Sequence, residues 1–159
     1  MTATKEKDFG TPGRHSAKLV TLEIDGVEVT VPEGTSLMRA AAEAGIGVPK
    51  LCATDTLEAF GSCRLCLVEI DKRKGYPASC TTLAEAVMKV RTRSAKLDDI
   101  RHGVMELYLS DHPADCREQA GNGVCEIHDL SRELGVTEVR YSGRGHAQTH
   151  LAAAPDTSN

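Results

Sequence analysis

The stretch that decides the fold is Phe60-Gly61-Ser62-Cys63-Arg64-Leu65-Cys66-Leu67-Val68-Glu69-Ile70, a close cysteine pair that leads directly into a strand-like run. Two more cysteines flank it, Cys52 and Cys80, and together the four have the spacing C-x10-C-x2-C-x13-C. Four thiolates can hold two irons bridged by sulfide, with two ligands to each iron. The close pair suits neighbouring positions on one loop, to which the fold must bring the other two. We therefore predict a [2Fe–2S] cluster on Cys52, Cys63, Cys66 and Cys80.

Three other interpretations of these cysteines are open at this stage. Zinc also takes four thiolates, but zinc ribbons usually contain two close C-x-x-C pairs, whereas Cys52 and Cys80 are isolated. A redox dithiol would need a helix to begin at the pair, yet Cys66 leads into Leu-Val-Glu-Ile. Buried structural cysteines pack as small apolar side chains and need no such grouping. The spacing favours iron–sulfur, then zinc, then structural cysteine.

The flanking sequence predicts a small mixed sheet packed on one helix. Asp25-Gly26 separates two strand-like runs, residues 18–24 and 27–31, and is a strong signal for a tight hairpin. A helix is expected over residues 37–44, capped by Thr35 or Ser36 and ended by Gly45. Further strands are expected over residues 67–70, around residues 78–81, and over residues 87–91. This order indicates an α+β fold.

After residue 93 the pattern becomes helical. Ser94 is a plausible N-cap, and Leu97, Ile100, Val104 and Leu107 recur at the spacing of a helix. A short second helix is expected over residues 126–134. We predict four parts: a flexible tail (1–16), a ferredoxin-like domain (17–93), a helical segment with a His/Cys motif (94–141) and a flexible C-terminus (142–159).

Composition narrows the function classes. The 159 residues carry a net charge of −4, and no basic patch with interleaved aromatics supports nucleic-acid binding. The first sixteen residues lack the apolar run of a secretion signal, and no stretch reaches the ~20 apolar residues of a membrane helix. We expect a cytoplasmic protein without a membrane span, where clustered cysteines indicate metal or redox chemistry more often than disulfides.

Residues 58–70, together with Pro77-Ala-Ser-Cys-Thr-Thr82, resemble a known family of large iron–sulfur subunits. The family includes the large iron–sulfur subunit of respiratory NADH:quinone oxidoreductase, the diaphorase part of bidirectional NiFe hydrogenases, and iron-only hydrogenases. The likeness is strongest to the alpha subunit of soluble NAD-dependent formate dehydrogenases. It extends over about residues 19–134 and implies a β-grasp, [2Fe–2S] ferredoxin-like domain. All four predicted cysteine ligands fall on the family pattern.

Residues 103–116 begin a second likeness, in which the family pattern H-x3-C-x2-C-x5-C supplies one His and three Cys to a [4Fe–4S] cluster. His112, Cys116 and Cys125 match this pattern, but Gln119 stands at the middle cysteine. A neutral amide is a poor ligand for iron–sulfur compared with a thiolate. The second site is then empty, or holds an altered cluster, or binds zinc with His128 as the fourth ligand. For His128 itself we favour an ordinary position on the helix surface.

The resemblance implies an electron-transfer subunit or fragment within an NAD-linked oxidoreductase complex, most like formate dehydrogenase. Its expected partners are flavin- or NAD-binding subunits and, in a formate dehydrogenase, a molybdopterin-containing one. No dinucleotide-binding glycine loop, nucleophile elbow or paired-carboxylate motif indicates an active site of its own. The alternative is a zinc-stabilised interaction module without redox activity.

Overall fold

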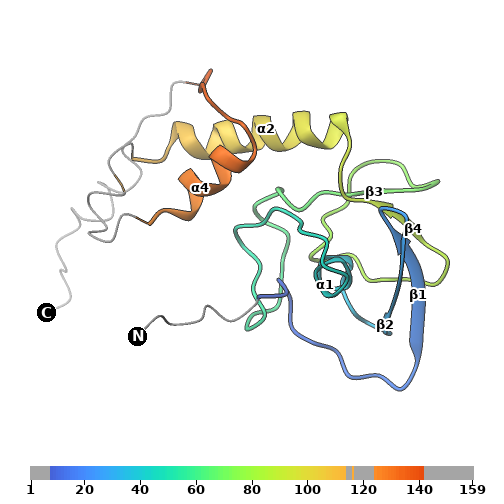
Figure 1. Cartoon of the computed structure of the whole chain (residues 1–159). Helices are drawn as coiled ribbons and strands as arrows, with labels where there is room; N and C mark the ends of the chain where they lie inside the picture. The colour runs from blue at the N-terminus through green and yellow to red at the C-terminus, as the bar shows by residue number, and fades with distance from the viewer. Residues whose placement is uncertain (1–7, 114–115, 117–123, 142–159) are drawn as a thin grey trace, which may run out of the picture. The chain divides into compact units, whose positions relative to one another are not determined.

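The computed structural model of the chain describes residues 8–113, 116 and 124–141 (Figure 1). The predicted C-terminal segment 142–159 therefore lies outside the described residues. The chain divides into two compact units, residues 1–99 and 100–159, which we treat separately. Among the described residues no helix is long and apolar enough to span a bilayer.

The first unit is a four-stranded sheet with one helix, α1 (Leu37–Glu43). The strands are β1 (Leu19–Ile24), β2 (Val27–Pro32), β3 (Glu69–Ile70) and β4 (Lys89–Arg91). Their order is β2-β1-β4-β3, in which β1 pairs antiparallel with β2 and parallel with β4, and β3 pairs antiparallel with β4. This mixed sheet, with α1 beside it in Figure 1, is the predicted β-grasp arrangement.

The core of this unit lies between the sheet and α1. Alternate residues of β1 (Val20, Leu22 and Ile24) are buried, as expected for a strand with one face on the core. They pack with apolar residues of the other elements: Val29, Val31, Leu37, Ala40, Ala41, Val68, Ile70, Ala84 and Val90. No aromatic side chain belongs to this core among the described residues, in keeping with a chain that has only two Phe, three Tyr and no Trp.

The predicted hairpin turn is confirmed. Asp25 and Gly26 have φ values of 49° and 82°, as a tight turn between twisted strands requires. The Asp25 carboxylate also accepts a hydrogen bond from the backbone N–H of Thr92 (2.7 Å), just after β4. The backbone of Asp25 therefore helps form the hairpin turn, and its side chain ties that turn to the end of β4.

The N-cap of α1 is Ser36, whose hydroxyl accepts from the Arg39 N–H at 3.1 Å. The same hydroxyl is 2.7 Å from the hydroxyl of Thr11, which is itself buried. Residues 1–7 of the predicted N-terminal tail lie outside the described residues, but the following segment packs on this unit. Gly10 has a φ of 85°, and a Cβ atom there would lie 2.5 Å from the Met38 sulfur, so both the backbone conformation and this contact favour glycine.

One predicted strand is wrong. The region around residues 78–81 forms no strand: Ala78 makes a single bridge to Leu67, and the chain then turns. The Ala78 carbonyl accepts from the N–H groups of Thr81 (3.2 Å) and Thr82 (3.1 Å). β4 also begins later than predicted, because Val87 has a φ of 57°, which a strand does not allow.

The second unit contains most of α2 (Ala95–Ser110) and all of α4 (Glu126–Glu133). Ser94 caps α2 as predicted, since its hydroxyl accepts from the Leu97 N–H at 3.2 Å. The predicted apolar stripe is only partly right, because Leu97 is buried but Leu107 is 55% exposed.

Three buried residues of α2 do not belong to that stripe: Met105, Arg101 and Glu106. Arg140 donates to both carboxylate oxygens of Glu106, and this hydrogen bonding holds the pKa of Glu106 below its usual value. A buried carboxylate with an arginine partner thus lies on α2 outside the predicted apolar stripe.

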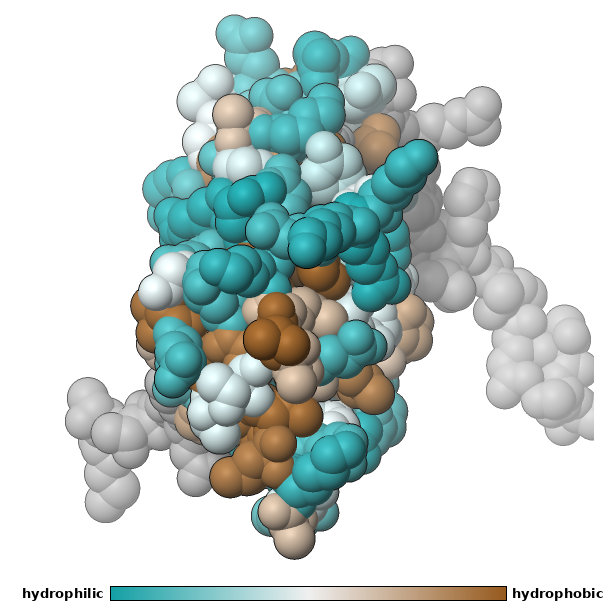
Figure 2. All heavy atoms as spheres, turned by 90° about the vertical axis from the view of Figure 1, so that its right-hand side faces the viewer, coloured by the Kyte–Doolittle hydropathy of each residue, from teal (hydrophilic) through white to brown (hydrophobic). Residues whose placement is uncertain are grey.

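Figure 2 shows one face of the molecule, where hydrophilic residues predominate in the upper part and hydrophobic ones gather lower down. The exposed large apolar residues of the first unit come from separate strands and loops: Leu19, Val27, Leu57, Phe60, Leu83 and Val87. Single exposed apolar residues are normal on protein surfaces, so they define no binding face by themselves.

Candidate metal centres

The first candidate centre is formed by the four cysteines of the first unit. Cys52, Cys63 and Cys66 lie on the long connection between α1 and β3, and Cys80 lies on the turn that replaces the predicted strand. The N–H of Cys63 donates to the sulfur of Cys52 at 3.3 Å, and the sulfurs of Cys66 and Cys80 are 3.4 Å apart. All four are free thiols. The fold therefore brings together four cysteines of which the first, Cys52, and the last, Cys80, are 28 positions apart in the sequence.

The loop that carries the close pair has an unusual backbone. Arg64 has a φ of 57°, in the left-handed region that residues other than glycine rarely adopt. This kink sits between Cys63 and Cys66, while the Leu65 side chain is fully buried. Gly61 also has a positive φ (72°), and a Cβ atom there would only touch Thr81 at 3.5 Å. Gly61 is therefore required by its backbone conformation rather than by lack of space.

The thiols of this group shift one another's pKa values. The hydrogen bond with Cys80 lowers the pKa of Cys66 to about 6, against the opposing effect of burial. The same interaction, with burial, raises the pKa of Cys80 far above its usual value. Burial likewise raises the pKa of Cys52. One thiolate stabilised by neighbouring thiols is the state from which a metal-binding thiolate group begins to form.

The buried hydroxyl of Ser79 is consistent with a cluster bound by these four cysteines. The Ser79 side chain is fully buried, and its oxygen has no hydrogen-bond partner among the described residues. It nevertheless lies near enough to the Cys66 sulfur to contribute to the lowered pKa of that thiol. Buried polar groups without a partner are rare in native proteins and usually indicate a missing one. A hydroxyl beside sulfur atoms suits a cluster whose sulfurs accept hydrogen bonds.

The second candidate centre lies in the second unit. His112, Cys116, Cys125 and His128 each present one ligand atom, and these four atoms lie within 4.8 Å of one another. The Cys116 sulfur is 3.1 Å from Nδ1 of His128, and the Cys125 sulfur is 3.2 Å from Nε2 of His112. The two imidazole rings meet edge to face with centroids 5.1 Å apart. Burial, and then the nearby His128, lower the pKa of His112, which favours the neutral ring that binds metals.

The structure brings together the three predicted residues of this second site, His112, Cys116 and Cys125. Gln119 lies outside the described residues. The interpretation of His128 as a surface histidine is wrong, because its ring contacts the Cys116 sulfur. The short spacing of Cys125 and His128 in the sequence was the signal that could have found it, whereas no signal in the sequence singled out Ser79.

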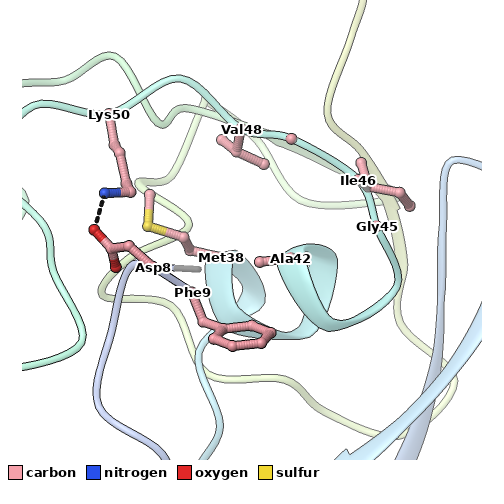
Figure 3. Close-up of a pocket in the computed structure, with 9 residues that line it drawn as sticks. Asp8, Phe9, Met38, Ala42, Gly45, Ile46, Val48 and Lys50 are labelled. Carbon is pink, nitrogen blue, oxygen red and sulfur yellow. Dashed lines mark hydrogen bonds and ion pairs between the residues drawn. The ribbon is translucent and has the colours of Figure 1, made fainter. Parts of the chain in front are cut away.

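A surface hollow of about 210 Å³ lies beside α1, lined mainly by apolar side chains that include Met38, Ile46 and Val48 (Figure 3). The one ion pair drawn there joins Lys50 to Asp8 at 2.6 Å. Both charged groups at its edge are thus already paired with each other. The hollow offers a ligand no converging polar groups, and we assign it no function.

Comparison with known proteins agrees with the two centres. Residues 17–95 match the 2Fe-2S iron-sulfur cluster binding domain, and residues 101–140 match the NADH-ubiquinone oxidoreductase-G iron-sulfur binding region. An NADH-quinone oxidoreductase subunit of Mycobacterium bovis is 44% identical over 79% of this chain. The NADP-reducing hydrogenase subunit HndD of Solidesulfovibrio fructosivorans is 39% identical over 79% of this chain.

The chain spans only part of these relatives, 16% of the M. bovis protein and 22% of HndD. Among solved structures, a chain of an NAD+-reducing [NiFe]-hydrogenase in the H2-reduced state has a TM-score of 0.70 at 29% identity. That match covers 79% of this chain and 53% of the hydrogenase chain.

Fold and matched regions define an iron–sulfur protein with a β-grasp, ferredoxin-like domain that binds a [2Fe–2S] cluster. The chain belongs to the complex I large iron–sulfur subunit family, of which it carries the N-terminal module.

Proposed function

We propose that this chain is a single-electron relay whose [2Fe–2S] cluster is held by Cys52, Cys63, Cys66 and Cys80. The observation that carries the proposal is the convergence of four free thiols from two separate connections of the chain. A buried hydroxyl without a hydrogen-bond partner among the described residues lies beside them. A [2Fe–2S] cluster supplies one-electron chemistry when bound, at a potential set by its surroundings.

In this relay the protein binds the cluster, shields one side of it from water and leaves the other side accessible to a partner. Cys63, Cys66 and Cys80 are buried, with Leu65 and Leu67 beside them, so this side excludes water. Cys52 is only half-buried and lies on the most accessible side of the group. We expect electrons to enter and leave near Cys52, where a partner can come closest.

We propose further that the donor and acceptor are other subunits of an NAD(P)-linked oxidoreductase in the cytoplasm. In support, the relatives are named as subunits of an NADH-quinone oxidoreductase and an NADP-reducing hydrogenase. The finer assignment to a formate dehydrogenase, with a molybdopterin-containing partner, is supported by the sequence resemblance. Co-purification from the native host distinguishes these complexes. A molybdopterin-containing subunit that co-purifies with the chain would support the assignment to a formate dehydrogenase, and subunits of a quinone reductase would contradict that assignment.

The test of the relay is electron paramagnetic resonance on anaerobic, dithionite-reduced protein, with iron and sulfide counted on the same sample. We expect one slowly relaxing signal with two irons and two sulfides per chain. Zinc in place of iron at the first centre, with no signal, would support the interaction-module alternative and reject the relay.

Ser79 gives a prediction about the potential. Ser79→Ala should lower the reduction potential by roughly 40 mV, because a hydrogen bond of about 1 kcal/mol to a sulfur favours the reduced, more negative cluster. The matched control is Ser62→Ala, which also precedes a ligand cysteine but is exposed. Redox titration followed by the electron paramagnetic resonance signal measures the reduction potential of each variant. Equal potentials in Ser79→Ala and Ser62→Ala would contradict the role of Ser79.

A further inference from the structure

The second centre has the dimensions of a site for one ion. Zinc–sulfur and zinc–nitrogen bonds of about 2.3 and 2.0 Å place tetrahedral ligand atoms roughly 3.3–3.8 Å apart. The four ligand atoms of His112, Cys116, Cys125 and His128 lie within 4.8 Å, and two sulfur–nitrogen pairs are already at 3.1 and 3.2 Å. Small shifts of these side chains would complete a tetrahedron around a single ion.

A [4Fe–4S] cluster makes a different demand on its ligands. Each ligand binds a different iron, so the ligands must stand around a four-iron core rather than around one point. The Cys116 sulfur contacts His128 and the Cys125 sulfur contacts His112 directly, which is closer than ligands on separate irons of such a core would lie. The sequence agrees, because Gln119 occupies the position of the middle cysteine in the family pattern.

The local structure explains how His128 becomes the fourth ligand. Cys125 is the N-cap residue of α4, yet its side chain does not cap the helix. Its sulfur instead points to His112, which follows the end of α2. His128 lies three residues further on, one turn into α4, so Cys125 and His128 are on the same side of the helix. Two ligands from α4 and two from the segment after α2 therefore surround one point.

We propose that His112, Cys116, Cys125 and His128 bind one zinc ion, in a closed structural site that takes the place of the family's second iron–sulfur cluster. Two thiolates and two imidazoles form a common structural zinc set. Zinc has no redox chemistry, so this site fastens the end of α2 to α4 and carries no electrons. The inference is independent of the relay proposed for the first centre.

The experiment counts metals in the full chain and uses Co²⁺ as a visible probe of geometry. To keep zinc from being counted at the first four cysteines, the background is the double variant Cys63→Ser/Cys66→Ser. We expect one Zn²⁺ per chain, and tetrahedral cobalt absorption with sulfur charge-transfer bands after exchange. His128→Ala should weaken zinc binding by more than ~100-fold, beyond the effect of losing an outer-shell partner.

His102→Ala is the matched control, because His102 also lies in the second unit and on α2, but outside the group. It should keep its zinc. Circular dichroism confirms that each variant is folded, and Cys116→Ser gives a second loss of zinc if His128→Ala unfolds.

A ligand exchange separates zinc from iron directly. Gln119→Cys/His128→Ala restores the family's one-His, three-Cys set and should take up iron and sulfide on anaerobic reconstitution, whereas the wild-type second site should not. Extra iron with a fast-relaxing signal in the wild type would overturn the proposal. Full zinc retention in His128→Ala would overturn it equally.

Discussion

Cys63→Ser and Cys66→Ser are each expected to abolish the [2Fe–2S] signal or leave a severely unstable cluster. Serine is a harder and less acidic ligand than cysteine, so it replaces a thiolate poorly at a soft iron–sulfur site. Both sulfurs are buried, and the first unit has no further cysteine among its described residues that could replace a lost ligand. Visible absorption, iron content and electron paramagnetic resonance measure the loss.

Cys116→Ser is the matched control for these variants. It removes a half-buried cysteine of the second unit and should leave the [2Fe–2S] signal unchanged. A full, unshifted signal in both Cys63→Ser and Cys66→Ser would reject the ligand assignment. Loss of the signal in Cys116→Ser would show that the two centres depend on each other.

Leu65→Ala is expected to destabilise the first unit by about 2–5 kcal/mol, which is the usual cost of removing a large apolar side chain from a packed interior. Leu65 is fully buried between the two cysteines of the close pair. This destabilisation is a large share of the ~5–15 kcal/mol that is the usual free energy of unfolding of a domain. The cavity would also let water reach the cluster and shorten its lifetime.

Denaturant unfolding followed by circular dichroism, and the rate at which the visible absorption decays, measure the two effects of Leu65→Ala. The control is Leu57→Ala, since Leu57 lies in the loop after Cys52 but is 66% exposed. It should change stability by less than about 0.5 kcal/mol. Equal effects of the two substitutions would contradict the shielding role of Leu65.

Local signals in the sequence predicted the parts of the fold that local chemistry controls. The positive φ values at Asp25 and Gly26 follow from residue type, as does the cap at Ser36, and both were predicted. The segment around Cys80 was predicted wrongly, because its apolar and β-branched residues suit a strand. The structure instead turns there, through the hydrogen bonds that the Ala78 carbonyl accepts.

The second unit shows the limit of periodicity. The spacing of apolar residues predicted α2 correctly, but it could not reveal that Arg140, far along the chain, pairs with the buried Glu106. His128 was misjudged for a similar reason, since its partner Cys116 lies twelve residues away. Long-range pairing of polar side chains is a property of the folded chain and leaves little trace in local sequence patterns.

The parallel pairing of β1 with β4 bears on the order of events during biosynthesis. Asp25 and Thr92, joined by a hydrogen bond, are separated by 67 positions, and all four cysteines of the first unit lie between them. A growing chain exposes these thiols before the strand that closes the sheet has emerged from the ribosome. The cysteines are therefore synthesised before β4 can pair with β1, at a stage when the completed sheet is not yet there to shield them.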